Sequence, residues 1–410
     1  MSAHGVAGTG KLVAVTGMGI ICCLGRGKDQ VWSRIVTGRH GFAPVSLPGF
    51  ERFSNKMAGQ VPAGLFEKPE LSPGRRLSRH ELFAWAAVSE ALGDAGWDKN
   101  PYKPEDVGIV SGMGSSGLLE AEEWYEARRA GKRRPSWLLH GYPSSALPDL
   151  LASAHCMRGP RFSIATACSS SGTALGMAAD LIRSGAVRAA LVLGSESLSR
   201  LTYGGFSSLR AMAPDLCRPF DSRRQGIILG EGAAAFLLED ADAAQARGAA
   251  IHGEVCGWGC TTDAHHMTAP LPDGSGLAQA MSQALVRTGL SPDQIGYINM
   301  HGTGTAHNDP SETAAVKSVF GDHARNMVLS STKSMTGHCL GAAGAIEAVF
   351  TLLALKSGMA PPTANLDEPD PACDLDYAPR TPRLIPGLRY AMNNVMAFAG
   401  NNISLILGAA

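Results

Sequence analysis

The sequence predicts an α/β protein, because short apolar runs without strict alternation are interleaved with longer segments of helical pattern. Its 410 residues and 45% hydrophobic content are enough for a large core or for two packed domains. A weak internal repeat is the third observation. Each half carries a strand-like run, a turn of small residues and a helix rich in Ala and Gly. We therefore expect two similar α/β halves.

The individual elements are recognised by their ends as well as by their apolar content. The strand-like runs end in Gly or Ser and have the composition of buried parallel or mixed strands. They cover residues 11–20, 106–114, 189–197 and 294–305. The helix-like segments often close with a glycine suited to a C-cap. They cover residues 78–96, 172–185, 276–289 and 343–358.

The repeat becomes visible when the chain is divided near residue 255, into an N-terminal half (1–255) and a C-terminal half (256–410). In the first half the turn before the Ala/Gly-rich helix contains Cys168, and in the second half it contains His338. Facing halves would bring these two helix starts to one centre. No low-complexity linker separates the halves, so we expect one rigid unit.

Overall composition excludes several classes of function. The 36 basic and 36 acidic residues balance, which argues against binding of nucleic acid or a membrane surface through bulk charge. No apolar run reaches the roughly 20 residues of a membrane span, and the first residues lack the apolar core of a signal peptide. We expect a cytoplasmic protein whose cysteines, apart from Cys168, are reduced and mostly buried.

Two familiar motifs are incomplete in this chain. Residues 112–117, GMGSSG, fit the GxGxxG pattern after a strand, but no acidic residue follows about 20 positions later, as a dinucleotide site requires. Tight strand-to-helix turns are the better interpretation. The serines at 169–171 do not stand in the GxSxG pattern of a serine hydrolase. The nucleophile available at this turn is the sulfur of Cys168.

Cys168 and two histidines have the setting that thiol chemistry needs. A cysteine among small residues is usually an inert core thiol, but at a helix start the unpaired backbone N–H groups stabilise a thiolate. His301 and His338 lie at strand or helix ends among small residues, where an imidazole can face a cavity. His265, His266 and His307 lack part of this setting, and we interpret them as structural or surface residues.

Several motifs together resemble those of the elongating β-ketoacyl-acyl-carrier-protein synthases. They are TACSSS at 166–171, HGTGT at 301–305, KSMTGHCLGAAG at 333–344, the stretch 218–240 and the C-terminal stretch 393–408. The order and spacing of the motifs match over nearly the whole chain. The resemblance implies a thiolase-like fold, in which two βαβαβ-type halves form a five-layered αβαβα core.

The resemblance also implies the roles of individual residues. Cys168, His301 and His338 would form the catalytic triad, with Lys333 beside it. Asp309 and Glu347 would support the site, although a satisfied ion pair at a helix end is an equally good interpretation of both. The backbone amides of Cys168 and Phe398 would form the oxyanion hole. Such an enzyme loads an acyl group onto its cysteine and then decarboxylates a malonyl thioester to an enolate that neutral imidazoles stabilise.

No metal or organic cofactor is implied. The helix start should keep His338 uncharged near pH 7. The enolate would attack the Cys168 thioester and lengthen the acyl chain by two carbons. A non-catalytic chain-length partner subunit is the alternative, but such relatives lack the active cysteine. A degradative thiolase would need a second catalytic cysteine, and Cys373 stands in a proline-rich stretch instead.

The implied partner is an acidic acyl carrier protein that delivers acyl and malonyl thioesters. A docking surface of this kind is basic, and a charge run can also be a plain solvated face. Arg129 and Arg210 are the sharper candidates. The full docking set is Arg75, Arg76, Arg79, Arg129 and Arg210.

The resemblance further predicts an acyl pocket lined by Met113, Phe206 and Phe398, completed across a homodimer interface. A heterodimer with a chain-length partner is the other possibility. Met113 would limit pocket depth or simply fill the core. Where the family reads GFGG around its gating phenylalanine, this chain reads AFAG, with Ala397 and Ala399 beside Phe398. Because glycine reaches backbone angles that alanine avoids, we expect a stiffer gate and a narrower range of acceptors.

Overall fold

The computed structural model describes residues 11–66, 69 and 76–410. Its strands are β1 (Val13–Cys22), β2 (Gly25–Arg26), β3 (Ala43–Pro44), β4 (Met57–Ala58), β5 (Val107–Gly112), β6 (Arg161–Ile164), β7 (Ala189–Glu196), β8 (Gly232–Asp240), β9 (Gly253–Thr262), β10 (Ile295–Asn299), β11 (Val328–Ser330), β12 (Met359–Ala360), β13 (Arg383–Leu384), β14 (Tyr390–Met396) and β15 (Asn401–Gly408). Its α-helices are α1 (Lys28–Val36), α2 (Arg79–Asp94), α3 (Leu118–Arg129), α4 (Ala146–His155), α5 (Ser170–Arg183), α6 (Arg200–Ser208), α7 (Ala241–Ala246), α8 (Ser275–Thr288), α9 (Asn308–Phe320), α10 (Lys333–Thr336) and α11 (Ala343–Ser357).

Within the described residues, eleven strands form one mixed sheet built from two equivalent parts. The first half-sheet has the order β6-β5-β7-β8-β1 and the second has β11-β10-β14-β15-β9. Numbered along the chain, both orders read third, second, fourth, fifth, first. The pattern of parallel and antiparallel pairs is also the same in both. The internal repeat is therefore a repeat of topology.

The two half-sheets meet where β1 pairs with β9, through Ala14 opposite Glu254 and Val15 opposite Gly253. The predicted division after residue 255 would cut through β9. Because β9 belongs wholly to the second half-sheet, we propose that the halves divide in the connection between α7 and β9.

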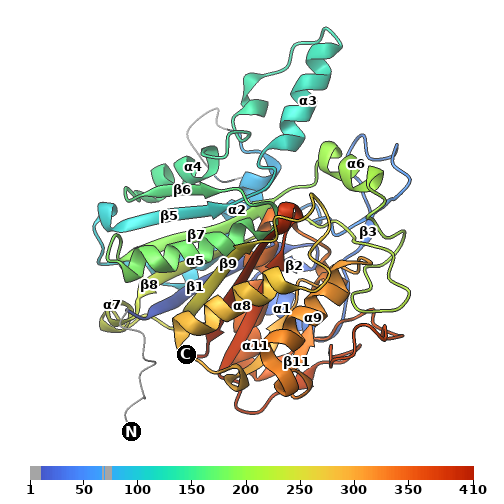
Figure 1. Cartoon of the computed structure of the whole chain (residues 1–410). Helices are drawn as coiled ribbons and strands as arrows, with labels where there is room; N and C mark the ends of the chain where they lie inside the picture. The colour runs from blue at the N-terminus through green and yellow to red at the C-terminus, as the bar shows by residue number, and fades with distance from the viewer. Residues whose placement is uncertain (1–10, 67–68, 70–75) are drawn as a thin grey trace.

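Helices cover both outer faces of the half-sheets and fill the space between them. α5 and α11 pack against each other and against strands of both half-sheets, so they form the central layer. α2 packs on the outer face of the first half-sheet and α8 on the outer face of the second. The result is the five-layered α/β arrangement of the thiolase-like fold. Figure 1 shows α3 projecting from this layered body.

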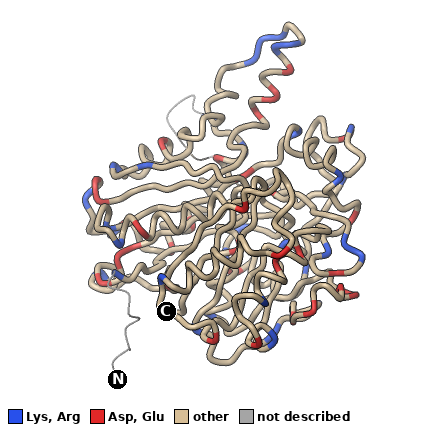
Figure 2. Tube along the Cα trace, viewed as in Figure 1, with Lys and Arg blue, Asp and Glu red and all other residues tan. Residues whose placement is uncertain are grey.

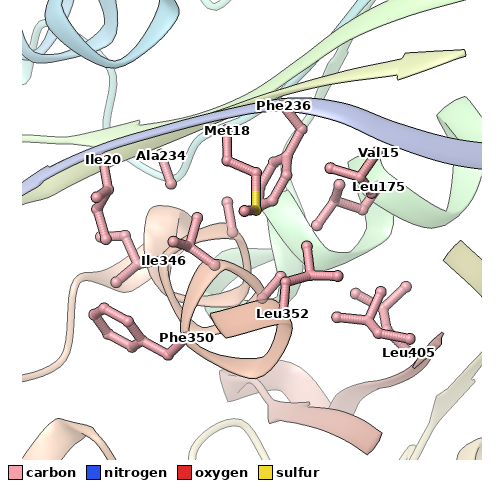
Figure 3. Close-up of a cluster of buried hydrophobic side chains, with 14 of the residues drawn as sticks. Val15, Met18, Ile20, Leu175, Ala234, Phe236, Ile346, Phe350, Leu352 and Leu405 are labelled. Carbon is pink, nitrogen blue, oxygen red and sulfur yellow. The ribbon is translucent and has the colours of Figure 1, made fainter. Parts of the chain in front are cut away.

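The central helix α11 explains why the core is continuous between the halves. Residues 343–355 are all buried, and a helix that is apolar all round is stable only inside a core. Figure 3 shows Ile346 and Leu352 of α11 on the side of the helix toward Met18 and Phe236 of the first half-sheet. The segment Leu340–Ser357 is long and apolar enough to cross a membrane, yet 89% of it is buried in this core.

Most predicted elements are present, with ends that differ by a few residues. The helix predicted at 78–96 is α2, which begins with a capping box formed by Ser78 and Glu81. The strand predicted at 294–305 is shorter, because β10 ends at Asn299 and the HGTGT segment continues as a loop. That difference matters for function, since the loop places His301 outside the sheet.

Candidate active site

Cys168 lies in a 3-10 turn, Ala167–Ser169, between the end of β6 and the start of α5. The preceding Ala167 has φ of 51°, in the left-handed region that is costly for a residue with a Cβ. This sharp turn presents the cysteine at the start of the central helix. Its side chain is only 5% exposed and lines a cavity of about 400 Å3.

Burial dominates the charge state of the Cys168 thiol. It raises the pKa of Cys168 to about 11, while the backbone amide of Phe398, the Lys333 ammonium and the amide of Cys168 itself lower it. The expected stabilisation of a thiolate at the helix start is thus outweighed by desolvation. The resting nucleophile is a neutral thiol that must lose its proton during acyl transfer.

The two histidines reach the same cavity from the second half of the chain. Their rings lie with centroids 5.2 Å apart and planes at 85°. The Nδ1 atom of His338 accepts a hydrogen bond of 3.1 Å from the backbone N–H of Leu340. Its proton is therefore on Nε2, which leaves one N–H available to a substrate. The Nδ1 atom of His301 is buried and has no hydrogen-bond partner among the described residues.

Both imidazoles are held in the neutral state. Burial lowers the pKa of His301 and of His338 well below the usual range, and the positive charge of Lys333 lowers both further. This direction agrees with the neutral His338 expected from the sequence. The sequence attributed the neutral state of His338 to the helix start, whereas burial and Lys333 lower its pKa in the structure.

Lys333 is the charged centre of the site and is itself buried. Its ammonium donates to the Oε1 atom of Glu347, which lies on α11. Burial raises the pKa of Glu347 to about 7, and Lys333 opposes that shift. The other carboxylate oxygen of Glu347 has no partner. The two residues form the buried ion pair that the sequence analysis offered as one interpretation of Glu347.

A second carboxylate that the sequence analysis overlooked holds the loop of His301. Glu312, on α9, accepts hydrogen bonds from the backbone N–H groups of His301 (2.6 Å) and Gly302 (2.8 Å). Asp309 instead accepts from Phe220 (2.8 Å) and Gly304 (3.2 Å). Both therefore support the loop. The signal in the sequence was the i, i+3 spacing of Asp309 and Glu312, which puts both side chains on one face of α9.

Cys168 and His338 come together because α5 and α11 cross at glycines. A Cβ placed on Gly344 would lie 2.7 Å from the backbone N of Gly172. The hydroxyl of Ser171 also accepts a hydrogen bond of 2.9 Å from the backbone N–H of Ala345. Side chains at this crossing would separate the helix starts, and with them the nucleophile and the imidazole.

The loop between β14 and β15 closes one wall of the cavity. The ring of Phe398 stacks on Phe206 of α6, with centroids 5.2 Å apart and planes at 27°. Ala399 has φ of 64°, whereas Ala397 is extended with φ of −110°. The backbone N–H of Ala399 donates to the Met267 carbonyl at 2.8 Å. Only Ala399 therefore occupies the conformation in which a Cβ is costly.

Met113 does not line this cavity. It is buried and packs in the hydrophobic cluster of the first half, beside Leu147 and Leu151. The cavity includes Phe206 and Phe398, as expected from the sequence, but its other apolar wall is Leu209 and Ile227. A role for Met113 in setting pocket depth stays a prediction.

The docking candidates have very different environments. Arg79 is not available, because its side chain is only 15% exposed and is bound to the fully buried Glu231. We therefore remove it from the docking surface. Arg76 is exposed and lies over the ring of Trp137, while Arg75 lies outside the described residues. Arg210 is exposed at the cavity wall, and Arg129 ends α3 on the projecting arm, where Figure 2 shows a concentration of basic residues.

Comparison with known proteins identifies relatives of the whole chain. The family models described as "Beta-ketoacyl synthase, N-terminal domain" and "Beta-ketoacyl synthase, C-terminal domain" match residues 11–244 and 252–367. The 3-oxoacyl-[acyl-carrier-protein] synthase 2 of Synechocystis is 36% identical over 407 residues, which are 96% of this chain and 97% of the relative. Nodulation protein E of Rhizobium meliloti is 38% identical over 400 residues, 96% and 98% of the two chains.

One solved structure with the same fold is that of a complex of two proteins. It is a ketosynthase from Xenorhabdus doucetiae in complex with its chain length factor, and it is 32% identical with a TM-score of 0.85. The match covers 100% of this chain and 100% of that one.

Proposed function

Because the chain belongs to the β-ketoacyl synthase family, we propose that it condenses an acyl group held on Cys168 with malonyl-acyl carrier protein. The product is a 3-oxoacyl thioester two carbons longer, in the synthesis of a fatty acid or polyketide. One observation carries this proposal. Cys168, His301 and His338 line a single cavity, and the amide of Phe398 faces the sulfur.

In the first half-reaction the acyl carbonyl moves from the carrier thiol to Cys168. The Cys168 sulfur forms the new thioester bond as its proton passes to the departing carrier thiol. Negative charge on the carbonyl oxygen is met by the backbone amides of Cys168 and Phe398. Because these donors belong to the folded backbone around the buried Cys168, they stabilise the tetrahedral intermediate without reorganisation.

In the second half-reaction malonyl thioester loses carbon dioxide. The electrons of the broken carbon–carbon bond form an enolate, whose oxygen accepts hydrogen bonds from the neutral imidazoles of His338 and His301. The enolate carbon then attacks the Cys168 thioester, and the sulfur leaves and takes up a proton. Burial keeps both imidazoles uncharged, and the positive charge of Lys333 acts in the same direction.

The experiment is the intact mass of the protein after incubation with a panel of acyl carrier proteins. The wild type should gain the mass of one acyl group, and Cys168→Ala should gain none. Addition of malonyl carrier protein should then release the acyl group as the longer 3-oxoacyl product. Acylation or condensation by Cys168→Ala would contradict the assignment. The pattern of masses also identifies the preferred acceptor.

The alternative of a non-catalytic chain-length partner is disfavoured by the presence of Cys168, His301 and His338 in one cavity. A thiolase reaction is disfavoured by Cys373, which is buried outside that cavity. Cleavage of acyl-coenzyme A without consumption of malonyl groups would favour the thiolase.

We propose that the carrier protein docks on Arg76, Arg129 and Arg210. The exposure of Arg129 and Arg210 supports this surface. Reversal of both charges should raise the KM for carrier-bound acyl groups and weaken its dependence on salt. An unchanged KM would contradict the proposed docking surface but not the proposed chemistry of Cys168.

We propose that the protein is a homodimer. The edge strand β6 supports this, because a free strand edge can pair with a second copy. The ketosynthase from Xenorhabdus doucetiae, solved with its chain length factor, makes a heterodimer the alternative. Native mass spectrometry of the isolated chain distinguishes the two. The cytoplasmic location expected from the sequence stays a prediction.

A further inference from the structure

α3 is held between the starts of two other helices by carboxylates on opposite sides. Glu120 and Glu122 are two positions apart, so their side chains leave the helix about 200° from each other. Glu120 accepts a hydrogen bond of 2.7 Å from the backbone N–H of Arg79, the first residue of α2. Glu122 does the same at the start of α6. The projecting arm is thus joined to both helices.

The contact with α6 is the more extensive one. Glu122 accepts from the backbone N–H of Arg200 at 3.0 Å and from that of Leu201 at 2.7 Å. It also accepts from the Nε of Arg200 at 3.1 Å, and the Nη1 of Arg200 lies 2.8 Å from Glu126 on the next turn of α3. The Glu122 and Arg200 side chains are only 13% and 10% exposed. A carboxylate here satisfies two N–H groups that the helix itself leaves unpaired.

The position of α6 determines one wall of the cavity. Tyr203, in the middle of the helix, is fully buried and its hydroxyl donates to the Met57 carbonyl at 3.0 Å. Arg200 lies three residues before this anchor and Phe206 three residues after it. A change at the start of α6 therefore tilts the helix about Tyr203 and moves Phe206, which stacks on Phe398.

We propose that Glu122 is a positioning residue that sets acceptor preference, because it fixes α6 and, through Phe206, the Phe398 loop. This rests on the function proposed above. The amide of Phe398 faces the Cys168 sulfur, so the same loop serves the oxyanion and shapes the entrance for the acyl chain. If α6 is released, the loop holds the amide of Phe398 less firmly near the oxyanion. The entrance then also selects less strictly among acyl chains.

The experiment compares acyl loading by Glu122→Ala with loading by the wild type, using acetyl and octanoyl carrier proteins. Acetyl loading should fall about tenfold, as for a lost helix cap. Octanoyl loading should fall less, so that the octanoyl to acetyl ratio rises at least about fivefold. A smaller folded fraction would scale both rates equally and leave the ratio unchanged. The ratio therefore separates positioning from simple loss of stability.

Glu123→Ala is the matched control. Glu123 is on the same helix and pairs with Arg134 at 3.1 Å, but both side chains are about half exposed and neither reaches α6. The Glu123→Ala variant should keep the octanoyl to acetyl loading ratio of the wild type. Glu122→Gln, which keeps one acceptor oxygen, should give an intermediate ratio.

If Glu122→Ala fails to fold, Arg200→Gln keeps the carboxylate at the start of α6 and should shift the ratio in the same direction by a smaller factor. A wild-type ratio in both variants would overturn the positioning role. Failure of the wild type to load any acceptor would instead overturn the proposed function.

Discussion

The turn before α5 and the turn before α11 have the same design and carry different chemistry. Each follows a strand of equivalent rank, β6 or β11, and each leads through a 3-10 turn into a central helix. In the second half α10 intervenes after β11, and His338 precedes the 3-10 turn. The first presents the thiol of Cys168 and the second the imidazole of His338. The repeated fold thus brings a thiol and an imidazole to one cavity.

The surroundings of the two turns differ in burial and charge. One side of α5 is half-buried, whereas residues 343–355 of α11 are all buried. The second turn is flanked by the buried pair of Lys333 on α10 and Glu347 on α11. The positive charge of Lys333, which acts after burial to lower the pKa of Cys168, His301 and His338, therefore lies in the second half. The first half contributes a thiol that is neutral at rest.

The largest expected effect is on the helix crossing that joins the two turns. Gly344→Ala would place a Cβ 2.7 Å from the backbone N of Gly172. We expect a loss of about 2–3 kcal/mol in the free energy of unfolding, with loss of condensation in the folded fraction. Gly93→Ala is the control, since nothing lies within 4 Å of its Cβ position on α2. It should stabilise by up to about 1 kcal/mol. Equal stabilities would show that the crossing tolerates side chains.

The next effect is a steeper dependence of stability on pH when Lys333 is removed. Burial already raises the pKa of Glu347 to about 7, and Lys333→Met takes away the charge that opposes this shift. The folded variant then keeps a proton that the unfolded chain releases near pH 4.5, so its stability falls as pH rises from 5 to 8. We expect the fall in urea unfolding to exceed that of the wild type by about 1 kcal/mol.

The control for that measurement is the double variant Lys333→Met with Glu347→Gln, which has no carboxylate to titrate. The fall specific to Glu347 should disappear in it. If the single and double variants follow the same curve between pH 5 and 8, the buried carboxylate does not titrate as we describe.

The sequence predicted the layered fold, and it also singled out Cys168, His301 and His338, which the structure brings to one cavity, because their motifs are local and ordered along the chain. It did not predict the pKa of Cys168, because burial depends on residues far apart in sequence, such as Val395 and Ile403. The same reason explains why the sequence wrongly placed Arg79 on the docking surface. A run of basic residues shows charge, but the partner Glu231 lies 152 residues away.

The smallest effect concerns the loop that carries Phe398. Ala399 has a positive φ and Ala397 does not, so the two glycine substitutions should differ. Ala399→Gly relieves strain and adds freedom, and we expect loading of long acceptors to quicken about two- to threefold. Ala397→Gly is the matched control and should leave the acceptor profile unchanged. Identical acceptor profiles for both variants and the wild type would contradict the proposal that the Phe398 loop is a stiff gate.

The most direct test of the different roles of the two turns is the variant His338→Ala. Two quantities are measured in one sample: the acyl mass on Cys168 and the carbon dioxide released from labelled malonyl carrier protein. Loss of the imidazole removes a donor to the enolate but leaves the thiol and the amide of Phe398 in place. We predict a normal acyl mass and no carbon dioxide above background. Carbon dioxide at the wild-type rate, or a folded variant that cannot be acylated, would contradict the account.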